Sequence, residues 1–360
     1  MLRKFIAFVI LFTAVFSVTV IAADDMNEII DNELEKVNAG DFDLVEFKNS
    51  FINEGKLPGI KDILGTIINL VFKEASVSIK TLSFLVIPLL LMGILSNLSL
   101  TSEGTVKMAE AVCALSLTAV IINVFISALT LCETAISEVN IMSLCMLPVM
   151  YSLLLSMGKI STYTVMHPTV IFLIHFIMNV INKLLIPAVL SGFILSLTDS
   201  IGGKGRFKRI TGLLIKTTKW VLIFLISIFT AILSAQNILT HSFDTVALKG
   251  SKFVVANFIP VIGGAIADGT EAVGSSLILI KNATGVAGLI GVMFIIFIPV
   301  IRIFLIGLSF YILSAVSQLF SMDKIAEVLD TSGSTVNMLG AIVISTAFLF
   351  VISIAVMLGG

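Results

Sequence analysis

The chain has 360 residues, of which 58% are hydrophobic and only 12% are charged, and its mean hydropathy is +1.12. Soluble domains are about 45–50% apolar and about 25% charged, so this much apolar surface cannot be hidden inside one globule. The composition predicts a polytopic membrane protein and argues against a soluble enzyme. The net charge of −1 argues against a nucleic-acid partner.

Residues 1–23 have the pattern of a secretory signal peptide. Arg3 and Lys4 supply a basic start, residues 5–18 are apolar, and Val20-Ile21-Ala22 offers a cleavage site. An uncleaved first membrane helix fits the same residues. Either interpretation places the following segment on the extracytoplasmic side, because a basic N-terminal cluster stays inside.

Residues 24–80 form an acidic and amphipathic segment. Residues 24–62 carry eleven acidic side chains against four lysines. Apolar residues then recur at helical spacing, at Ile60, Ile63, Leu64, Ile67, Ile68 and Val71. The spacing predicts a helix that packs on a partner, lies along the membrane interface, or covers the protein's own membrane bundle.

Residues 81–360 are predicted to form a helical transmembrane domain, with the lipid bilayer as a partner. A span needs about 20 mostly apolar residues to cross about 30 Å of hydrocarbon. This criterion predicts about eight spans, near 82–100, 108–131, 141–157, 164–182, 184–198, 213–235, 286–313 and 338–358. The predicted fold class is an all-α polytopic membrane protein with about seven or eight spans, preceded by the amphipathic helical segment.

The loop 199–219 sets the predicted orientation. It holds six basic side chains and one acid, so the positive-inside rule places it in the cytoplasm. Counting back through the predicted spans returns residues 24–80 to the outside, together with an acidic loop at 132–140. The connector 318–335 falls on the cytoplasmic side, where we expect a short amphipathic helix ended by Gly333, as a docking surface or a plain connector.

Residues 252–285 are apolar but are interrupted by turn-forming and charged residues. These are Pro260, Gly263, Gly264, Asp268, Gly269, Glu271 and Gly274. Freed backbone groups and charges need partners inside a membrane. We therefore expect a broken or re-entrant segment enclosed by protein, or two interfacial helices on the outer face. Weak similarity between the sequences around Pro187 and Pro299 also suggests an internal repeat of the kind found in transport proteins.

Arg302 is the strongest single candidate for function, because it lies in the middle of a predicted span. A charge there costs about 2.5–3.5 kcal/mol on insertion scales, so Arg302 should face a cavity or a carboxylate. The candidate carboxylates are Glu110, Asp268 and Glu271. A packing ion pair and an ion pathway are the two interpretations.

Polar residues also share one face of the predicted span 164–182. They are His167, His175, Asn179 and Asn182. Such a row fits a polar lining or a proton relay, and it equally fits interhelical hydrogen bonding.

No residue pattern points to enzyme chemistry. The three cysteines have neither disulfide nor zinc spacing, and Gly202-Gly-Lys-Gly-Arg lacks the order of a phosphate-binding loop. No catalytic triad or carboxylate pair is visible. We therefore expect no catalytic, cofactor-binding or metal-binding residues and no nucleotide partner.

Four short stretches in the last third of the chain carry a family likeness. They are Asn257-Phe-Ile-Pro-Val-Ile-Gly-Gly, Asp268-Gly-Thr-Glu-Ala-Val, Ser276-Leu-Ile-Leu-Ile-Lys-Asn-Ala-Thr-Gly-Val and Leu329-Asp-Thr-Ser-Gly. With the leader, the acidic segment and the spans, they resemble the stage III sporulation protein AE family.

That resemblance implies a spore-forming bacterium and a subunit of the channel-like complex between the mother cell and the engulfed forespore. The complex is similar to specialised secretion systems, is sometimes called a feeding tube, and supports forespore development. The implied location is the mother-cell membrane around the forespore, with other membrane subunits as partners. The rival hypothesis is a stand-alone secondary transporter with a broken-helix site near Arg302.

Overall fold

The computed structural model describes residue 83 and residues 85–94, 103–202, 207–258 and 263–359. The predicted signal peptide and the acidic segment 24–80 lie outside the described residues. The described part consists of helices and short turns without a strand, which confirms the all-α class.

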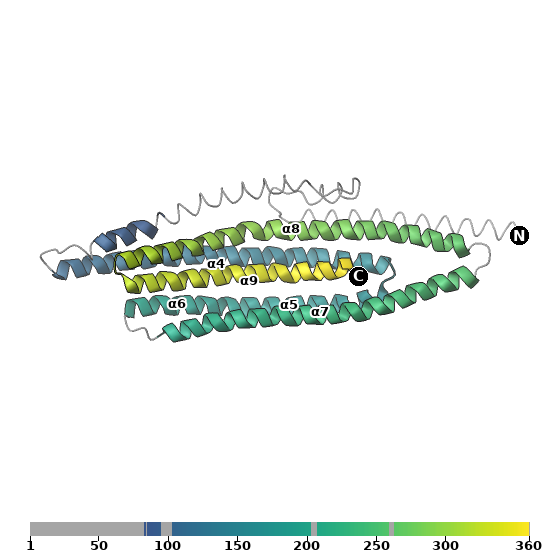
Figure 1. Ribbon diagram of the computed structural model, residues 1–360, viewed down its shortest axis with the longest axis horizontal. Coiled ribbons are helices and arrows are strands. Elements are labelled where there is room, and N and C mark those ends of the chain that lie inside the picture. The colour runs from purple at the N-terminus through teal and green to yellow at the C-terminus, as the bar shows by residue number, and fades with distance from the viewer. Residues whose placement is uncertain (1–82, 84, 95–102, 203–206, 259–262, 360) are drawn as a thin grey trace.

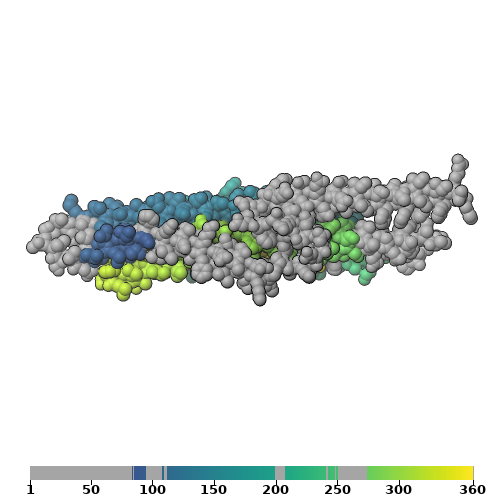
Figure 2. Space-filling view, turned by 90° about the horizontal axis from the view of Figure 1, so that it is seen from above, coloured from purple at the N-terminus to yellow at the C-terminus, as the bar shows by residue number. Residues whose placement is uncertain are grey.

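Long helices lie side by side in an elongated bundle (Figure 1). They are α4 (Glu103–Ser156), α5 (Ile160–Val180), the π-helix η1 (Ile181–Leu185), α6 (Ile186–Gly202), α7 (Lys208–Phe258), α8 (Gly263–Leu319) and α9 (Asp323–Gly359). Helices α4, α8 and α9 pack together, and α7 packs against both α5 and α6. A short helix, Leu85–Ile94, lies near the end of α8 (Figure 2). A Cβ atom on Gly93 would lie 2.7 Å from the ring of Phe320, which follows α8.

The described residues contain five helices long and apolar enough to cross a membrane, fewer than the seven or eight predicted. Helix α4 contains two predicted spans, so the acidic loop expected at 132–140 is helical instead. The buried side chains of Cys132, Ala135, Ile136 and Val139 continue the helical stripe through this stretch. Because Glu133 points outward, its charge does not interrupt the packing that holds the helix.

The hairpin expected near Lys183 and Pro187 is also absent, because α5, η1 and α6 follow one another without a turn. Proline lacks a backbone N–H and its ring crowds the preceding turn of a helix. The wider π turn just before Pro187 accommodates this locally. Two pairs of predicted spans have therefore merged, and the predicted span 82–100 is described only as the short helix Leu85–Ile94. The predicted side of the basic loop then rests on its positive charge and not on a count of crossings.

Two further boundaries differ from the sequence prediction. A helix boundary does fall in the predicted broken segment, since α7 ends at Phe258 and α8 begins at Gly263, but Gly264, Gly269 and Gly274 lie inside α8 and do not break it. Glycine costs only about 1 kcal/mol in a helix interior, which a helix of this length tolerates. Pro260 lies outside the described residues.

Helix α9 likewise runs through Gly333, where the connector helix was expected to end. This glycine instead allows α8 and α9 to approach closely. A Cβ atom on Gly333 would lie 3.1 Å from the backbone oxygen of Gly307 and 3.2 Å from the ring of Tyr311. Small residues at such a seam are typical of helix pairs in membranes.

Replacing Gly333 with leucine should destabilise the protein by about 1–3 kcal/mol, because overpacking forces the two backbones apart. The thermal unfolding midpoint of the purified protein in detergent measures the effect. Gly274→Leu is the matched control, since a Cβ there meets nothing within 4 Å. Equal midpoints for the two variants would contradict close packing at Gly333.

Candidate functional site

Arg302 lies half-buried in α8, far from the carboxylates that the sequence offered as partners. Asp268 and Glu271 precede it on the same continuous helix, so a rise of about 1.5 Å per residue separates them from Arg302 by about 51 and 46 Å. Gly288 packs against Met142 and Met146 of the antiparallel α4. This register places Arg302 opposite residues near 130, about 30 Å from the level of Glu110. The helical rise and the register of α4 and α8 therefore place the backbones of all three predicted partners far from Arg302.

The polar face predicted on α5 does not line an interior. His175 and Asn179 are exposed, and each bonds to its own helix: His175 Nδ1 lies 2.9 Å from the Ile171 carbonyl oxygen, and Asn179 donates to the His175 carbonyl. His167 is half-buried among the rings of Tyr151 and Tyr163. The hydrogen bonds of His175 and Asn179 therefore stay within α5, and His167 packs against tyrosine rings.

A buried carboxylate on α7 caps the beginning of α5. Asp244 is 3% exposed, and its carboxylate accepts hydrogen bonds from the backbone N–H groups of Ser161 and Thr162, at 2.8 and 3.0 Å. It also accepts a bond from the Thr162 hydroxyl at 2.6 Å. The first N–H groups of a helix have no partner within the helix, and a negative charge there is favourable.

A buried lysine on α8 caps the end of α9 in the complementary way. Lys281 is 3% exposed, and its ammonium group donates to the carbonyl oxygens of Met357 and Leu358, both at 3.2 Å. The last carbonyls of a helix lack internal partners and favour a positive charge. Lys159 lies near enough to repel Lys281. Burial lowers the pKa of Lys159, while the Asp244 carboxylate opposes that shift.

These two caps mark the point where α7 and α8 leave the bundle. Residues 245–258 of α7 extend about 21 Å beyond Asp244, and residues 263–280 of α8 extend about 27 Å before Lys281. Figure 1 shows both helices running past the C-terminus. We call these two stretches the arm.

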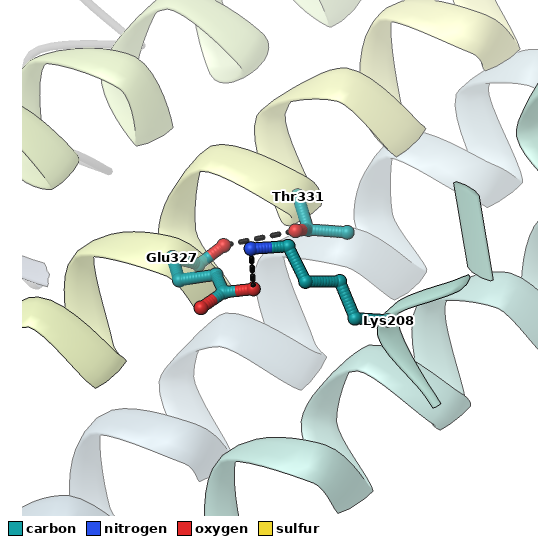
Figure 3. Close-up of polar contacts among 3 residues, drawn as sticks. All are labelled: Lys208, Glu327 and Thr331. Carbon is teal, nitrogen blue, oxygen red and sulfur yellow. Dashed lines mark hydrogen bonds and ion pairs between the residues drawn. The ribbon is translucent and has the colours of Figure 1, made fainter. Parts of the chain in front are cut away.

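The opposite end of the bundle holds a groove of about 590 Å³ between α6, α7 and α9. We call it the basic groove. It is lined by Ser196, Lys208, Thr211, Gly212, Ile215, Lys216, Lys219, Lys324, Glu327, Val328, Asp330, Thr331 and Ser334. Lys208 pairs with Glu327 at 2.8 Å, and the Thr331 hydroxyl donates to the Glu327 backbone oxygen at 2.9 Å (Figure 3). Most of the predicted basic loop is helical, since α6 runs to Gly202 and α7 begins at Lys208, and most of the predicted connector belongs to α9. Both of these segments, predicted to be cytoplasmic, meet at this end.

Comparison with known proteins decides the family. The model of the stage III sporulation protein AE family matches residues 42–360, most of the chain. The chain belongs to this family. The stage III sporulation protein AE of Bacillus subtilis (strain 168) is 24% identical over 310 residues, which cover 86% of this chain and 78% of that protein. No solved structure matches the chain. The resemblance seen in the sequence is confirmed.

Sequence analysis of this family member missed Asp244 and Lys281. The available signal was a charge beside or within an apolar stretch, as in Ile280-Lys281-Asn282. Their helix-end partners lie 76 to 83 positions away in sequence, so no local spacing reveals them. Among the described residues, no group of three or more His, Cys, Asp or Glu side chains could hold a metal ion.

Replacing Asp244 with alanine should destabilise the protein by about 1–3 kcal/mol, because it leaves three donors at the start of α5 without an acceptor. Asp244→Asn keeps one acceptor oxygen, so its stability should lie between that of the wild type and that of Asp244→Ala. The thermal midpoint in detergent measures the change. Glu327→Ala is the control, since it removes an exposed ion pair worth at most about 1 kcal/mol. A loss for Asp244→Ala no larger than that of the control would contradict the capping role.

Proposed function

We propose that this chain is a polytopic membrane subunit of the channel-like complex that links the mother cell to the engulfed forespore and supports forespore development. Membership of the stage III sporulation protein AE family carries the proposal. In this function the protein resides in the mother-cell membrane around the forespore and assembles with other membrane subunits. Its role is structural or conduit-forming rather than enzymatic.

The lengths of the helices support a role that extends beyond one bilayer. Helices α7 and α8 have 51 and 57 residues, which correspond to about 76 and 85 Å. The hydrocarbon core of a bilayer is only about 30 Å thick. The basic groove lies at the end predicted to face the cytoplasm. The arm then projects from the other face, into the space between the two membranes.

The surface near the base of the arm favours a protein partner there. Ile238, Leu239, Phe243 and Val246 on α7 are all at least 60% exposed. These residues lie in the apolar stretch Lys208–Ala247, whose 40 residues are about twice what a hydrocarbon core of about 30 Å needs, so in this proposal the end near the arm meets another subunit instead of lipid. This patch is the natural contact for another subunit of the complex.

The transporter hypothesis has no comparable support. It required a site near Arg302 formed by broken helices, whereas α8 is continuous through the predicted glycine breaks. The carboxylates that would have completed that site lie at other levels of the bundle.

Deleting the gene in its spore-forming host should leave engulfment intact and stop forespore development afterwards. Heat-resistant spore counts and microscopy of membrane-stained cells measure the outcome. A wild-type copy at a second locus is the control and should restore sporulation. Normal numbers of heat-resistant spores in the deletion strain would overturn the proposed function.

The proposed orientation is tested separately by cysteine labelling in vegetative cells. In a background without Cys113, Cys132 and Cys145, a membrane-impermeant maleimide should label Lys249→Cys in intact cells. Lys324→Cys, which is also exposed but lies at the basic groove, should react only after permeabilisation. The reverse pattern would place the arm in the cytoplasm and contradict the proposal.

A further inference from the structure

We propose that the basic groove binds the phosphate headgroup of an anionic membrane phospholipid. The groove joins residues of α6, α7 and α9, and its volume of about 590 Å³ falls within the range of sites for small ligands. The inference uses only this end of the bundle and does not depend on the sporulation role.

The charges that line the groove favour an anion. Four lysines face two carboxylates, and Lys208 is already paired with Glu327. Lys216, Lys219 and Lys324 then face Asp330 as the remaining carboxylate of the lining. Among the described residues, no ion pair joins any of these three lysines to an acid. A bound phosphate would offset the excess positive charge.

The Thr211 hydroxyl is a second and independent sign of a ligand. Thr211 lines the groove and is 3% exposed, and its hydroxyl oxygen is one of six buried side-chain oxygens without a hydrogen-bond partner among the described residues, the only one of them in the groove lining. A buried polar group without a partner is costly, and native structures contain few of them. The hydroxyl is covered in this structure, and by turning toward the groove it would donate a hydrogen bond to a phosphate oxygen. Gly212 beside it keeps space open, since a Cβ atom there would meet nothing within 4 Å.

The position of the groove beside the expected membrane interface favours a lipid as the source of the phosphate. Trp220, the single tryptophan of the chain, is 67% exposed and stacks on Phe224 with ring centroids 5.5 Å apart. Exposed tryptophan is typical of the membrane interface, and lysines just outside it extend toward the headgroups. Lys216 and Lys219 lie within four residues of Trp220 on the same helix. The side chains of Ile215 and Val328 in the lining would contact the apolar part of the lipid.

The test measures binding of phosphatidylglycerol and phosphatidylcholine to the purified full-length protein in detergent, by titration with fluorescently labelled lipid. The wild type should bind phosphatidylglycerol more tightly than phosphatidylcholine. The double variant Lys216→Gln/Lys219→Gln should lose about 30-fold in affinity for phosphatidylglycerol, because each lysine near an anionic lipid surface contributes about fivefold. The charge-matched control is Lys183→Gln/Lys249→Gln, two exposed lysines outside the groove, which should bind as the wild type.

Two uncharged variants separate a defined site from general attraction. Gly212→Leu fills the groove and Thr211→Val removes the hydroxyl, and both should weaken phosphatidylglycerol binding while the thermal midpoint is kept. Equal loss in the groove and control lysine variants would overturn the proposal. Competition by inorganic phosphate or glycerol phosphate as effective as the lipid would assign the groove to a soluble anion and also overturn it.

Discussion

Helices of unequal length cannot all end together, and each end that stops beside a longer neighbour leaves backbone groups without partners. In this bundle α5 begins and α9 ends alongside the longer α7 and α8. Asp244 and Lys281, carried by the longer helices, supply charges of the correct sign to those ends. Because the alternative is unpaired donors and carbonyls in an apolar setting, these two side chains fix how far α7 and α8 slide along the bundle.

Close packing fixes the other degree of freedom, the separation of the helices. Along the seam of α8 and α9, Gly307 faces Asn337, Gly333 faces the backbone of Gly307, and Gly340 faces Ile303. Lipid tails are as apolar as leucine, so burial of apolar surface alone gives little preference for one helix pair in a membrane. Close contact at glycines supplies that preference, and the polar caps then set the register.

The sequence was sufficient for the fold class and the family, because each follows from composition or from a local pattern. It was insufficient for the number of crossings. A window matched to the thickness of a bilayer splits a long helix wherever a charge or proline appears. In α4 the buried face at Ala135 and Ile136 continues past outward-facing Glu133, and at Pro187 a π turn replaces the expected hairpin. Helix-end partners such as Asp244 and Thr162, 82 positions apart, depend on the packing itself and cannot be seen in one sequence.

The two ends of the bundle therefore carry different chemistry. At one end buried charges are fully engaged in capping helices, so their substitution acts on stability. At the other end Lys216, Lys219 and Lys324 are not needed for any described contact, and surface charges of this kind contribute little to folding. A chain that keeps several like charges around a buried, unpartnered hydroxyl gains no stability from that arrangement. The arrangement is explained by a ligand, and because it is separate from the caps, function at the groove can be removed while the fold is retained.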